Sequence, residues 1–335
     1  MNRSNRVFGA VAAVSAAALI LAGCSGSDDA GGAPTGGGEG LQKITVGTVG
    51  IISYGSILGG IEQGFFADEG LEVETTTIAN PPAGMAAAQS GQLDVSYSPS
   101  IPLLNALSQG VEIQVVAAAD GFPPNMEIEP GVTVVDDTGL YAAVGSDITE
   151  VTDLAGKTVS VPARNAQLEV TIAALLDDAG IDTTSGVNWV VLDFTSAVAA
   201  LESGTVDAAG LVSPFTDEAE AAGAARIASP AIEFFGAGAI GLWVAGKQQI
   251  AADPDLYERF QRAANKASEW ANEHPEEAIQ AGLDFNESNL TVADMNVPFW
   301  PTEVTQEDLD RPNESLVQLG YLDAPAPTDG VIWTK

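Results

Sequence analysis

The chain has 335 residues, of which 46 are acidic and 12 are lysine or arginine, so its formal net charge is −34. This excess of negative charge argues against a nucleic-acid partner, because binding to phosphates needs clustered basic residues. It also argues against broad adhesion to anionic lipid, and it is typical of a solvated protein surface. The length is enough to bury an ample core and suggests two domains.

The N-terminus has the pattern of a secretion signal. Residues 1–6 carry two arginines, and an uncharged run rich in Ala and Val extends from Val7 to Ala22. A positive start, a short apolar middle and small residues at the end are typical of a signal peptide. The run is shorter than the roughly 20 residues that a membrane-spanning helix needs. We therefore expect residues 1–23 to be a signal peptide.

The only cysteine of the chain, Cys24, directly follows Leu-Ala-Gly. A lone cysteine cannot form an intrachain disulfide, and it has no second cysteine with which to hold a metal. The stretch Leu21–Cys24 resembles the bacterial lipobox, which implies cleavage before Cys24 and acylation of its thiol and new amino group. Two or more acyl chains anchor a protein stably to a membrane. The alternative is an ordinary signal peptide with an incidental cysteine.

The segment after Cys24 is predicted to be a tether. Ser25–Gly40 reads SGSDDAGGAPTGGGEG, with seven glycines and no large apolar residue. Such a composition stays flexible. We expect residues 24–42 to join the membrane anchor to the folded part of the chain.

Residues 43–97 alternate between strand and helix patterns. Strands are predicted at Lys43–Gly50, Leu71–Ile78 and Leu93–Tyr97, and helices at Ser53–Phe66 and Pro81–Gln89. This alternation predicts βαβ units and a parallel sheet.

The same pattern returns later in the chain. Strands are predicted at Thr158–Val161, Asn188–Leu192 and Ala208–Val212, and helices at Gln167–Ala179 and Ser196–Leu201. Both halves contain the joint Ser-Gly-x-[Leu/Val]-Asp, at Ser90–Asp94 and at Ser203–Asp207. One such joint is an ordinary glycine helix stop. Two joints at matched positions indicate two lobes of the same topology.

The C-terminal third is predicted to be helical. Asp253 and Pro254 supply an N-cap and a proline at the first helical position. Apolar residues then follow at helical spacing from Leu256 to Ala271, which predicts a face that packs in the core. Another helix is expected to start at Thr305–Asp308 and to end near Gly320.

Several stretches are similar in order and spacing to the solute-binding lipoproteins of ABC importers. They are GFFADEGLEVE (Gly64–Glu74), SGQLDVSYSPS (Ser90–Ser100), VTDLAGKTVSVP (Val151–Pro162), ALESGTVDAAGLVSPF (Ala200–Phe215), IAADPDLYERF (Ile250–Phe260) and EWANEHPEEA (Glu269–Ala278). The chain most resembles the nitrate, sulfonate and taurine subgroup, which includes binders of thiamine precursors. The likeness covers the chain from about Lys43 onward.

This resemblance implies two doubly wound α/β lobes, the type II periplasmic-binding-protein fold, with a ligand cleft between them. The crossovers are expected near Phe122–Leu140 and Ile232–Trp243. Lobe 1 would then comprise residues 43–125 and 242–335, and lobe 2 residues 126–241. The implied protein is a monomer, lipid-anchored on the extracytoplasmic face of the cell membrane, that delivers a small solute to the permease subunits of an importer.

Contact residues of the first lobe follow from general topology. Ligands of open α/β sheets bind beyond the carboxyl ends of strands, where helix N-termini offer free N–H groups. The residues expected there are Ser53, Tyr54, Gly55, Asn80, Tyr97, Ser98 and Ser100. A plain helix cap is the alternative role for Ser53, and core packing is the alternative for Tyr54.

In the second lobe the expected contacts are Arg164, Asn165, Thr195, Ser213 and Phe215. Arg164 is the one basic residue expected in the cleft, and a guanidinium binds carboxylates, sulfonates or phosphates with two parallel hydrogen bonds. Its alternative is a surface pair with a nearby carboxylate. Arg164 and the serines favour an oxyanion, while aromatic residues such as Phe194 and Phe215 favour an organic body. The prediction is a small organic anion such as a sulfonate.

Other sequence patterns give weaker indications of function. Gly236–Gly241 spells GxGxxG but precedes an apolar run, so it fails the context of a dinucleotide site. The only histidine, His274, is expected on the surface, and no Cys/His cluster suggests a metal. We therefore expect no cofactor, no metal and no catalysis. The alternatives are a non-transport binding lipoprotein such as a sensor's partner, a binder of a thiamine-precursor-like heterocycle, and an enzyme on the same fold.

Overall fold

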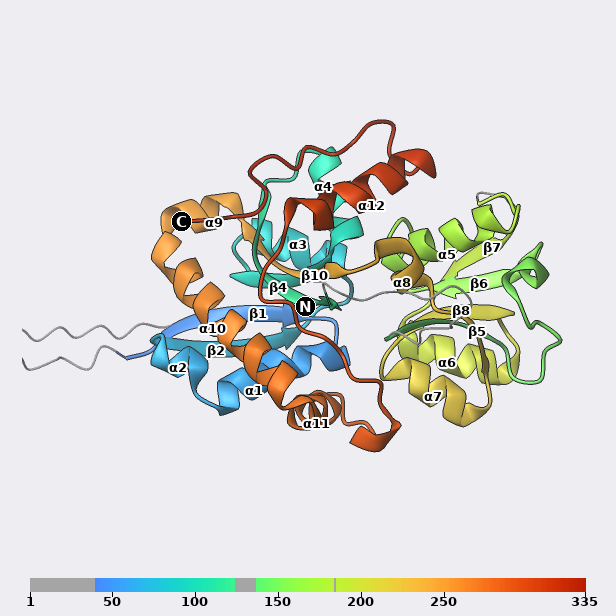
Figure 1. The fold of residues 1–335 in the computed structure, drawn as a ribbon, viewed down its shortest axis with the longest axis horizontal. Helices are drawn as coiled ribbons and strands as arrows, with labels where there is room; N and C mark the ends of the chain where they lie inside the picture. Colours follow the sequence, from blue (N-terminus) through green and yellow to red (C-terminus); the bar gives the residue numbers. More distant parts are fainter. Residues whose placement is uncertain (1–39, 124–136, 184) are drawn as a thin grey trace, which may run out of the picture. The chain divides into compact units, whose positions relative to one another are not determined.

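Two five-stranded sheets, each covered by helices on both faces, make up the folded part of the chain (Figure 1). The structure is a computed structural model that describes residues 40–123, 137–183 and 185–335. The predicted signal peptide, Cys24, most of the predicted tether and part of the first predicted crossover lie outside these residues. Residues 40–335 belong to one compact unit. No helix of the described residues is long and apolar enough to cross a membrane.

The first sheet has the strand order β2-β1-β3-β10-β4. Its strands are β1 (Gln42–Thr48), β2 (Leu71–Thr77), β3 (Val95–Pro99), β4 (Ile113–Phe122) and β10 (Gly238–Gly246). β1 is parallel to β2 and β3, whereas β10 runs antiparallel to β3 and β4.

The second sheet repeats this arrangement in the order β7-β6-β8-β5-β9. Its strands are β5 (Thr138–Ala142), β6 (Thr158–Val161), β7 (Asn188–Val191), β8 (Ala208–Val212) and β9 (Ala225–Ala228). β6 is parallel to β7 and β8, and β5 is antiparallel to β8 and β9. The predicted fold class is confirmed. The predicted parallel pairing of the βαβ strands is confirmed. The sheets as a whole are mixed, because in each of them one strand returns antiparallel beside the βαβ units.

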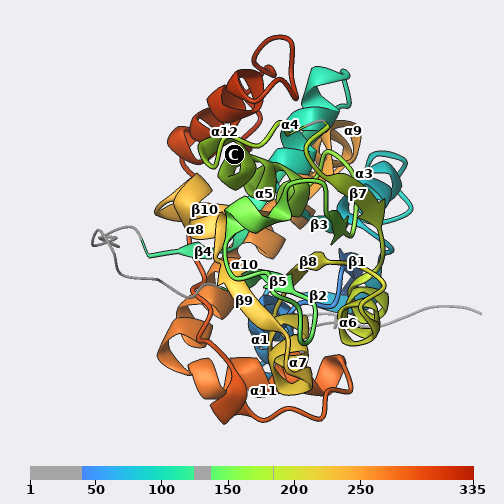
Figure 2. The same cartoon turned by 90° about the vertical axis from the view of Figure 1, so that its right-hand side faces the viewer.

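The helices divide between the two sheets. Around the first sheet lie α1 (Gly55–Glu62), α2 (Phe65–Asp68), α3 (Pro81–Gln89), α4 (Ser100–Ser108), α9 (Lys247–Ala252), α10 (Pro254–Glu273), α11 (Pro275–Phe285) and α12 (Gln306–Gln318). The second sheet has α5 (Gln167–Asp178) and α8 (Pro230–Phe235) on one face and α6 (Phe194–Ser203) and α7 (Phe215–Ala222) on the other (Figures 1 and 2). Three short 3₁₀ helices complete the described elements: η1 (Ile52–Tyr54), η2 (Val151–Leu154) and η3 (Val292–Asp294).

The two Ser-Gly-x-[Leu/Val]-Asp joints form the same hydrogen bonds in both sheets. Gly91 and Gly204 have φ angles of 74° and 66°, a left-handed conformation that favours glycine. The carboxylate of Asp94 then accepts the backbone N–H of Thr45 on β1 at 2.7 Å. In the same way Asp207 accepts the N–H of Thr158 on β6 at 2.8 Å, also 49 residues earlier. In each sheet the aspartate that precedes the third strand of the βαβ units is thus hydrogen-bonded to the backbone of the first of these strands.

Helix ends follow the predicted chemistry. The Asp253 carboxylate accepts the N–H of Leu256 at the start of α10, and α12 opens with a capping box between Thr305 and Asp308. Phe260 and its neighbours on α10 are buried against the first sheet, as predicted.

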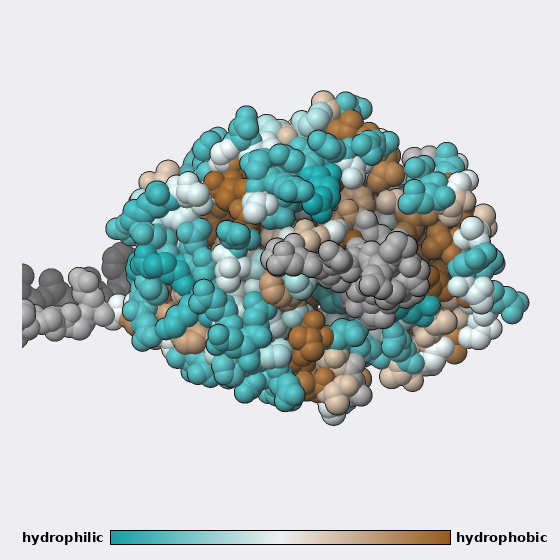
Figure 3. All heavy atoms as spheres, in the orientation of Figure 1, coloured by the Kyte–Doolittle hydropathy of each residue, from teal (hydrophilic) through white to brown (hydrophobic). Residues whose placement is uncertain are grey.

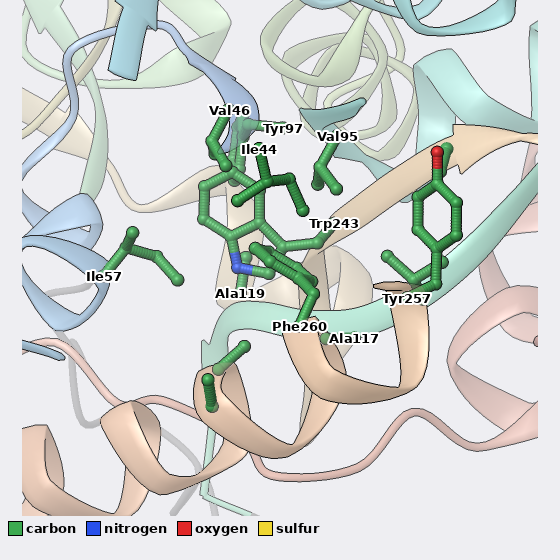
Figure 4. Packing of buried hydrophobic residues seen from close by; sticks show 14 of the residues in the cluster. Ile44, Val46, Ile57, Val95, Tyr97, Ala117, Ala119, Trp243, Tyr257 and Phe260 are labelled. Atoms are coloured by element: carbon green, nitrogen blue, oxygen red, sulfur yellow. The ribbon is translucent and has the colours of Figure 1, made fainter. Parts of the chain in front are cut away.

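Trp243 on β10 is the centre of the core beneath the first sheet (Figure 4). Its ring lies 5.8 Å from those of Tyr54 and Tyr97 and 6.4 Å from that of Phe260, measured between centroids. Aromatic rings bury large areas and prefer such tilted contacts. This packing fixes Tyr97, whose strand end borders the site described next. On the face drawn in Figure 3, hydrophilic residues predominate over the helices around the first sheet.

Candidate ligand-binding site

A cavity of about 320 Å³ lies between the two sheets. Its lining comes from the residues that follow the carboxyl ends of six strands, three from each sheet. They are Val49, Ile51, Thr77, Ile78, Ala79, Asn80, Pro81, Tyr97 and Pro99 beside the first sheet, and Pro162, Ala163, Asp193, Phe194, Thr195, Val212 and Phe215 beside the second. Pro102, Thr138, Ala166, Gln167 and Leu168 complete it. This is the place where open α/β sheets bind ligands, and the volume suits a small molecule.

The wall from the second sheet is aromatic. Phe194 and Phe215 begin α6 and α7, and their rings stack with centroids 5.1 Å apart and planes 23° apart. Both side chains are only half-buried although they adjoin well-packed helices. An apolar ligand body would cover them further, which is favourable in proportion to the area removed from water.

Two helix N-termini at the cavity are already capped. The Asn80 side-chain oxygen accepts the N–H of Ala83 at 3.0 Å, and the first two residues of α3 are prolines, which have no N–H. The Asp193 carboxylate accepts the N–H and the hydroxyl of Ser196 at 2.9 and 2.8 Å. These hydrogen bonds, the backbone one first, hold the pKa of Asp193 below its ordinary value.

Gln167 is the first residue of α5, whose N-cap Ala166 supplies no side-chain cap. The side-chain oxygen of Gln167 is buried and has no hydrogen-bond partner among the described residues. A buried acceptor without a donor is costly. This amide therefore marks a polar position at which a ligand donor would be favourable.

Asp120 lies directly behind Tyr97. Its carboxylate accepts the Ser53 hydroxyl at 2.9 Å and the Tyr97 hydroxyl at 3.4 Å. Burial raises the pKa of Asp120 to about 6, although the hydrogen bonds from Ser53, Tyr97 and the Gly241 backbone oppose the shift. The Asp120 carboxylate thus accepts a hydrogen bond from the lining residue Tyr97, although Asp120 itself does not line the cavity.

Four of the predicted contact residues line the cavity: Asn80, Tyr97, Thr195 and Phe215. Six others, Ser53, Tyr54, Gly55, Ser98, Ser100 and Ser213, are buried next to it and do not line it. Their role in binding stays a prediction.

The neighbours of these six residues show what they do in the fold. Tyr54 packs on Trp243 and Phe285 in the core. At Gly55 a Cβ atom would lie 1.8 Å from the carbonyl oxygen of Ala278, so the close approach of α11 requires glycine. Ser98 and Ser213 donate to the Pro99 carbonyl and to the Asp217 carboxylate, at 3.0 and 2.8 Å.

Arg164 and Asn165 do not line the cavity; they belong to a group of residues that we call the Glu169 cluster, with Glu169 and Tyr321. The guanidinium binds the Glu169 carboxylate through Nε at 2.6 Å and Nη2 at 3.1 Å. The Glu169 side chain is 2% exposed and that of Arg164 49%. The Asn165 N–H and the Tyr321 hydroxyl complete the cluster, at 2.7 and 3.2 Å from the carboxylate. Of the two roles considered for Arg164, the structure shows the ion pair.

Sequence reasoning missed Asp120, Gln167 and Asp193 as polar groups at the site. Asp193 had a usable signal, since Asp-x-x-Ser after a strand predicts a helix cap at the strand's carboxyl end. Asp120 ends the apolar run VVAAAD, and nothing in that run shows which neighbours it meets.

The other patterns lie away from the cavity lining. His274 is exposed and stacks on Trp270, with ring centroids 5.5 Å apart. Gly236–Gly241 runs from the end of α8 into β10, not from a strand into a helix. In the part of the chain that the structure describes, no group of three His, Cys, Asp or Glu residues could hold a metal ion.

The fold is that of the periplasmic binding proteins. The structure matches the alkanesulfonate-binding protein SsuA from Xanthomonas axonopodis pv. citri with a TM-score of 0.70 and 14% identity, over 87% of this chain and 98% of that one. It matches the nitrate-binding protein NrtA from Synechocystis PCC 6803 with a TM-score of 0.66 and 14% identity, over 87% and 84%. The desulfurization enzyme DSZB shares the fold as well, with a TM-score of 0.60 and 16% identity, over 88% and 97%.

The sequence defines the family. Residues 53–278 match the family model described as NMT1/THI5 like, and the chain belongs to this family. The family resemblance predicted from the sequence is thereby confirmed. No curated protein matches the chain in sequence.

Proposed function

We propose that the chain is the extracytoplasmic solute-binding protein of an ABC-type importer. It holds a small organic molecule between two lobes and presents it to the permease. The observation that carries this proposal is the cavity itself, which is bordered by the carboxyl ends of strands from both sheets. Family membership and the likeness to binding proteins support it.

The two sheets are the lobes of this proposal, and hinge closure would bring them together. Contacts between them are present at several points: the Ile52 N–H donates to the Ser213 carbonyl at 3.3 Å, and the Asn105 amide donates to the Asn165 carbonyl at 2.5 Å. We retain the expected lobe boundaries as part of the proposal. β10 begins at Gly238 in the first sheet, slightly before the expected boundary at 241/242.

We further propose that residues 1–23 direct export, that Cys24 is acylated and that residues 24–42 tether the lobes to the outer face of the membrane. The lipobox-like sequence and the glycine-rich composition support this.

Binding without turnover is the proposed chemistry. The described lining residues offer an aromatic wall and several hydrogen-bonding groups, and neither cysteine nor histidine is among them. A nucleophile or a general base of those types would have to come from elsewhere in the chain.

The expected organic anion has lost its main support. It depended on Arg164, and that guanidinium is paired with Glu169 outside the cavity lining. The aromatic wall still supports an organic body. The charge of the ligand is therefore reconsidered below.

A thermal-shift panel tests the proposed function. It would contain taurine, alkanesulfonates, aromatic sulfonates, carboxylates and their amides, nitrate, thiamine precursors and riboflavin. A ligand at 100 times its dissociation constant adds about 2.7 kcal/mol to the free energy of unfolding, which raises Tm by a few degrees.

The shift should be lost in Phe215→Ala and kept in Phe65→Ala, which removes a half-buried phenylalanine from the first position of α2. A protein that no member of the panel stabilises, and that carries no small molecule in native mass spectrometry, contradicts the proposed function.

A further inference from the structure

The one charged side chain on the described lining of the cavity is acidic. It is Asp193, and Lys, Arg and His are absent from the described lining. Asp120 lies behind Tyr97 within hydrogen-bond distance of its hydroxyl. The described lining therefore offers no positive side chain that would offset these carboxylates.

Arg164 and Arg226 have partners elsewhere in the fold. Arg164 forms two hydrogen bonds with Glu169. Arg226 donates to the Thr138 carbonyl at 2.6 Å and pairs with Glu220 at 3.3 Å, and its guanidinium lies over the Tyr141 ring. Each guanidinium is thus paired with a carboxylate that offsets its charge, and neither belongs to the described lining of the cavity.

Backbone donors are limited at the helix starts as well. Two of the helices that begin at the cavity, α3 and α6, are capped by Asn80 and Asp193, and α3 begins with two prolines. The first turns of α5 and α7 contain acidic residues, which oppose the partial positive charge with which a helix N-terminus attracts anions. The helix α4, which begins directly after the lining residue Pro99, has neither a side-chain cap nor an acidic residue in its first turn.

The lining also contains a side-chain acceptor without a donor. The side-chain oxygen of Gln167 is buried without a partner among the described residues. An acceptor in this state is satisfied by an N–H or O–H group and left unsatisfied by a sulfonate or carboxylate oxygen.

We propose that the cavity selects a small organic solute without negative charge, either uncharged or protonated, whose apolar body packs on Phe194 and Phe215 and whose N–H or O–H groups donate to Gln167. This inference deepens the proposed solute-binding function and rests on it. It differs from the anion that Arg164 suggested in the sequence.

Charged thiol reagents test this preference even while the solute is unidentified. In the full chain carrying Cys24→Ser, Thr195→Cys places a single thiol on the cavity lining, at the start of α6. Ser203→Cys places a matched thiol at the exposed end of the same helix. Each variant is labelled with a methanethiosulfonate bearing trimethylammonium and with one bearing sulfonate. The uncharged methyl reagent corrects for accessibility.

For each position we divide the labelling rate with the cationic reagent by the labelling rate with the anionic reagent. This ratio should be about tenfold higher at position 195 than at position 203. Asp193→Asn, which keeps an acceptor for the helix cap, should reduce the ratio at position 195 severalfold. Should Thr195→Cys fail to fold, Ala163→Cys, which lines the cavity after the neighbouring strand β6, replaces it.

A ratio at position 195 no higher than at position 203 overturns the inference, and solute binding as such can still stand. Conversely, a raised ratio in a protein that binds no solute supports the charge preference while the proposed function fails. The two failures are therefore distinguishable.

Discussion

The loop of residues 162–167 contributes residues both to the cavity and to the Glu169 cluster, and these residues differ in polarity. Ala163, Ala166 and Gln167 line the cavity, whereas Arg164 and Asn165, which lie between them in sequence, join Glu169. The residues of this loop that line the cavity are mainly apolar, and the side-chain oxygen of Gln167 has no donor. The Glu169 cluster is charged, and every oxygen of its carboxylate has a donor.

This difference shows where a strongly acidic protein places one of its few basic side chains. An arginine near a strand end has a carboxylate within reach five residues later, and a bidentate pair is the strongest contact open to it. The cluster also includes Tyr321 from the C-terminal segment, so it joins the two sheets. The charge therefore stabilises the arrangement of the lobes, and the ligand is left to neutral groups.

The buried carboxylates of Asp120 and Glu169 are expected to differ most in how they contribute to the free energy of unfolding. Asp120 has only neutral donors, and burial raises its pKa to about 6 from an ordinary value of about 4. In this range the native state keeps a proton on Asp120 that the unfolded state loses, so the contribution of Asp120 to stability is largest below pH 4 and is lost as the pH rises through 6. A shift of about two pKa units corresponds to about 3 kcal/mol.

Urea unfolding from pH 4 to 7 measures this effect. Asp120→Asn should remove the decline, whereas the exposed Asp147→Asn should leave it in place. Parallel pH profiles of the Asp120→Asn variant and the unchanged protein would contradict the raised pKa.

Glu169→Ala should destabilise the protein by about 2 to 3 kcal/mol. It leaves the Arg164 guanidinium, the Asn165 N–H and the Tyr321 hydroxyl without their shared acceptor. The control Glu314→Ala removes an exposed glutamate from α12 and should change stability by less than about 0.5 kcal/mol. Equal effects of the two substitutions in denaturant unfolding would show that the cluster contributes nothing.

Phe215→Ala should weaken the tightest ligand of the panel by about thirtyfold, because about 2 kcal/mol of apolar contact is lost at the aromatic wall. Isothermal titration calorimetry measures this, with Phe65→Ala as the control. An unchanged dissociation constant would move the ligand away from this wall.

Gln167→Leu should weaken the same ligand by about tenfold, the value of one hydrogen bond of about 1.4 kcal/mol. Gln280→Leu makes the same change at an exposed position of α11 and should have no effect. If the two variants bind equally well, the amide of Gln167 does not contact the ligand.

The smallest effect on ligand affinity is expected for Arg164→Ala. Its guanidinium does not line the cavity, so the dissociation constant should stay within about twofold, although stability falls because the buried Glu169 carboxylate loses its charged partner. A tenfold loss of affinity would restore Arg164 as a ligand contact and favour an anion.

The sequence predicts the strands of the βαβ units better than it predicts the antiparallel strands that complete each sheet. The strands of the βαβ units were predicted from local patterns, and the Ser-Gly-x-[Leu/Val]-Asp joints revealed the repeat. β10 was missed because it is buried on both faces and lacks alternation, as buried strands do. Its antiparallel pairing depends on a return from the second sheet, which no local pattern encodes.

For the site, the topological rule was more reliable than residue chemistry. Asn80, Tyr97, Thr195 and Phe215 were found because they lie at or after the carboxyl ends of strands. Ser98 and Ser213 lie at such ends too, but their side chains donate to neighbouring acceptors in the fold. Which of two adjacent residues faces the cavity depends on the local φ and ψ angles and on packing. At Asn165, for example, the φ angle is 55°.

Identification of the bound solute tests the central claim most directly. The protein is purified without denaturation, examined by native mass spectrometry, and then unfolded so that the released molecule can be analysed. The account predicts one small organic molecule per chain, uncharged or cationic, which is absent from Phe215→Ala and present in Phe65→Ala. A sulfonate, carboxylate or nitrate released from the cavity would contradict the predicted charge, and a molecule equally abundant in both variants would contradict the site.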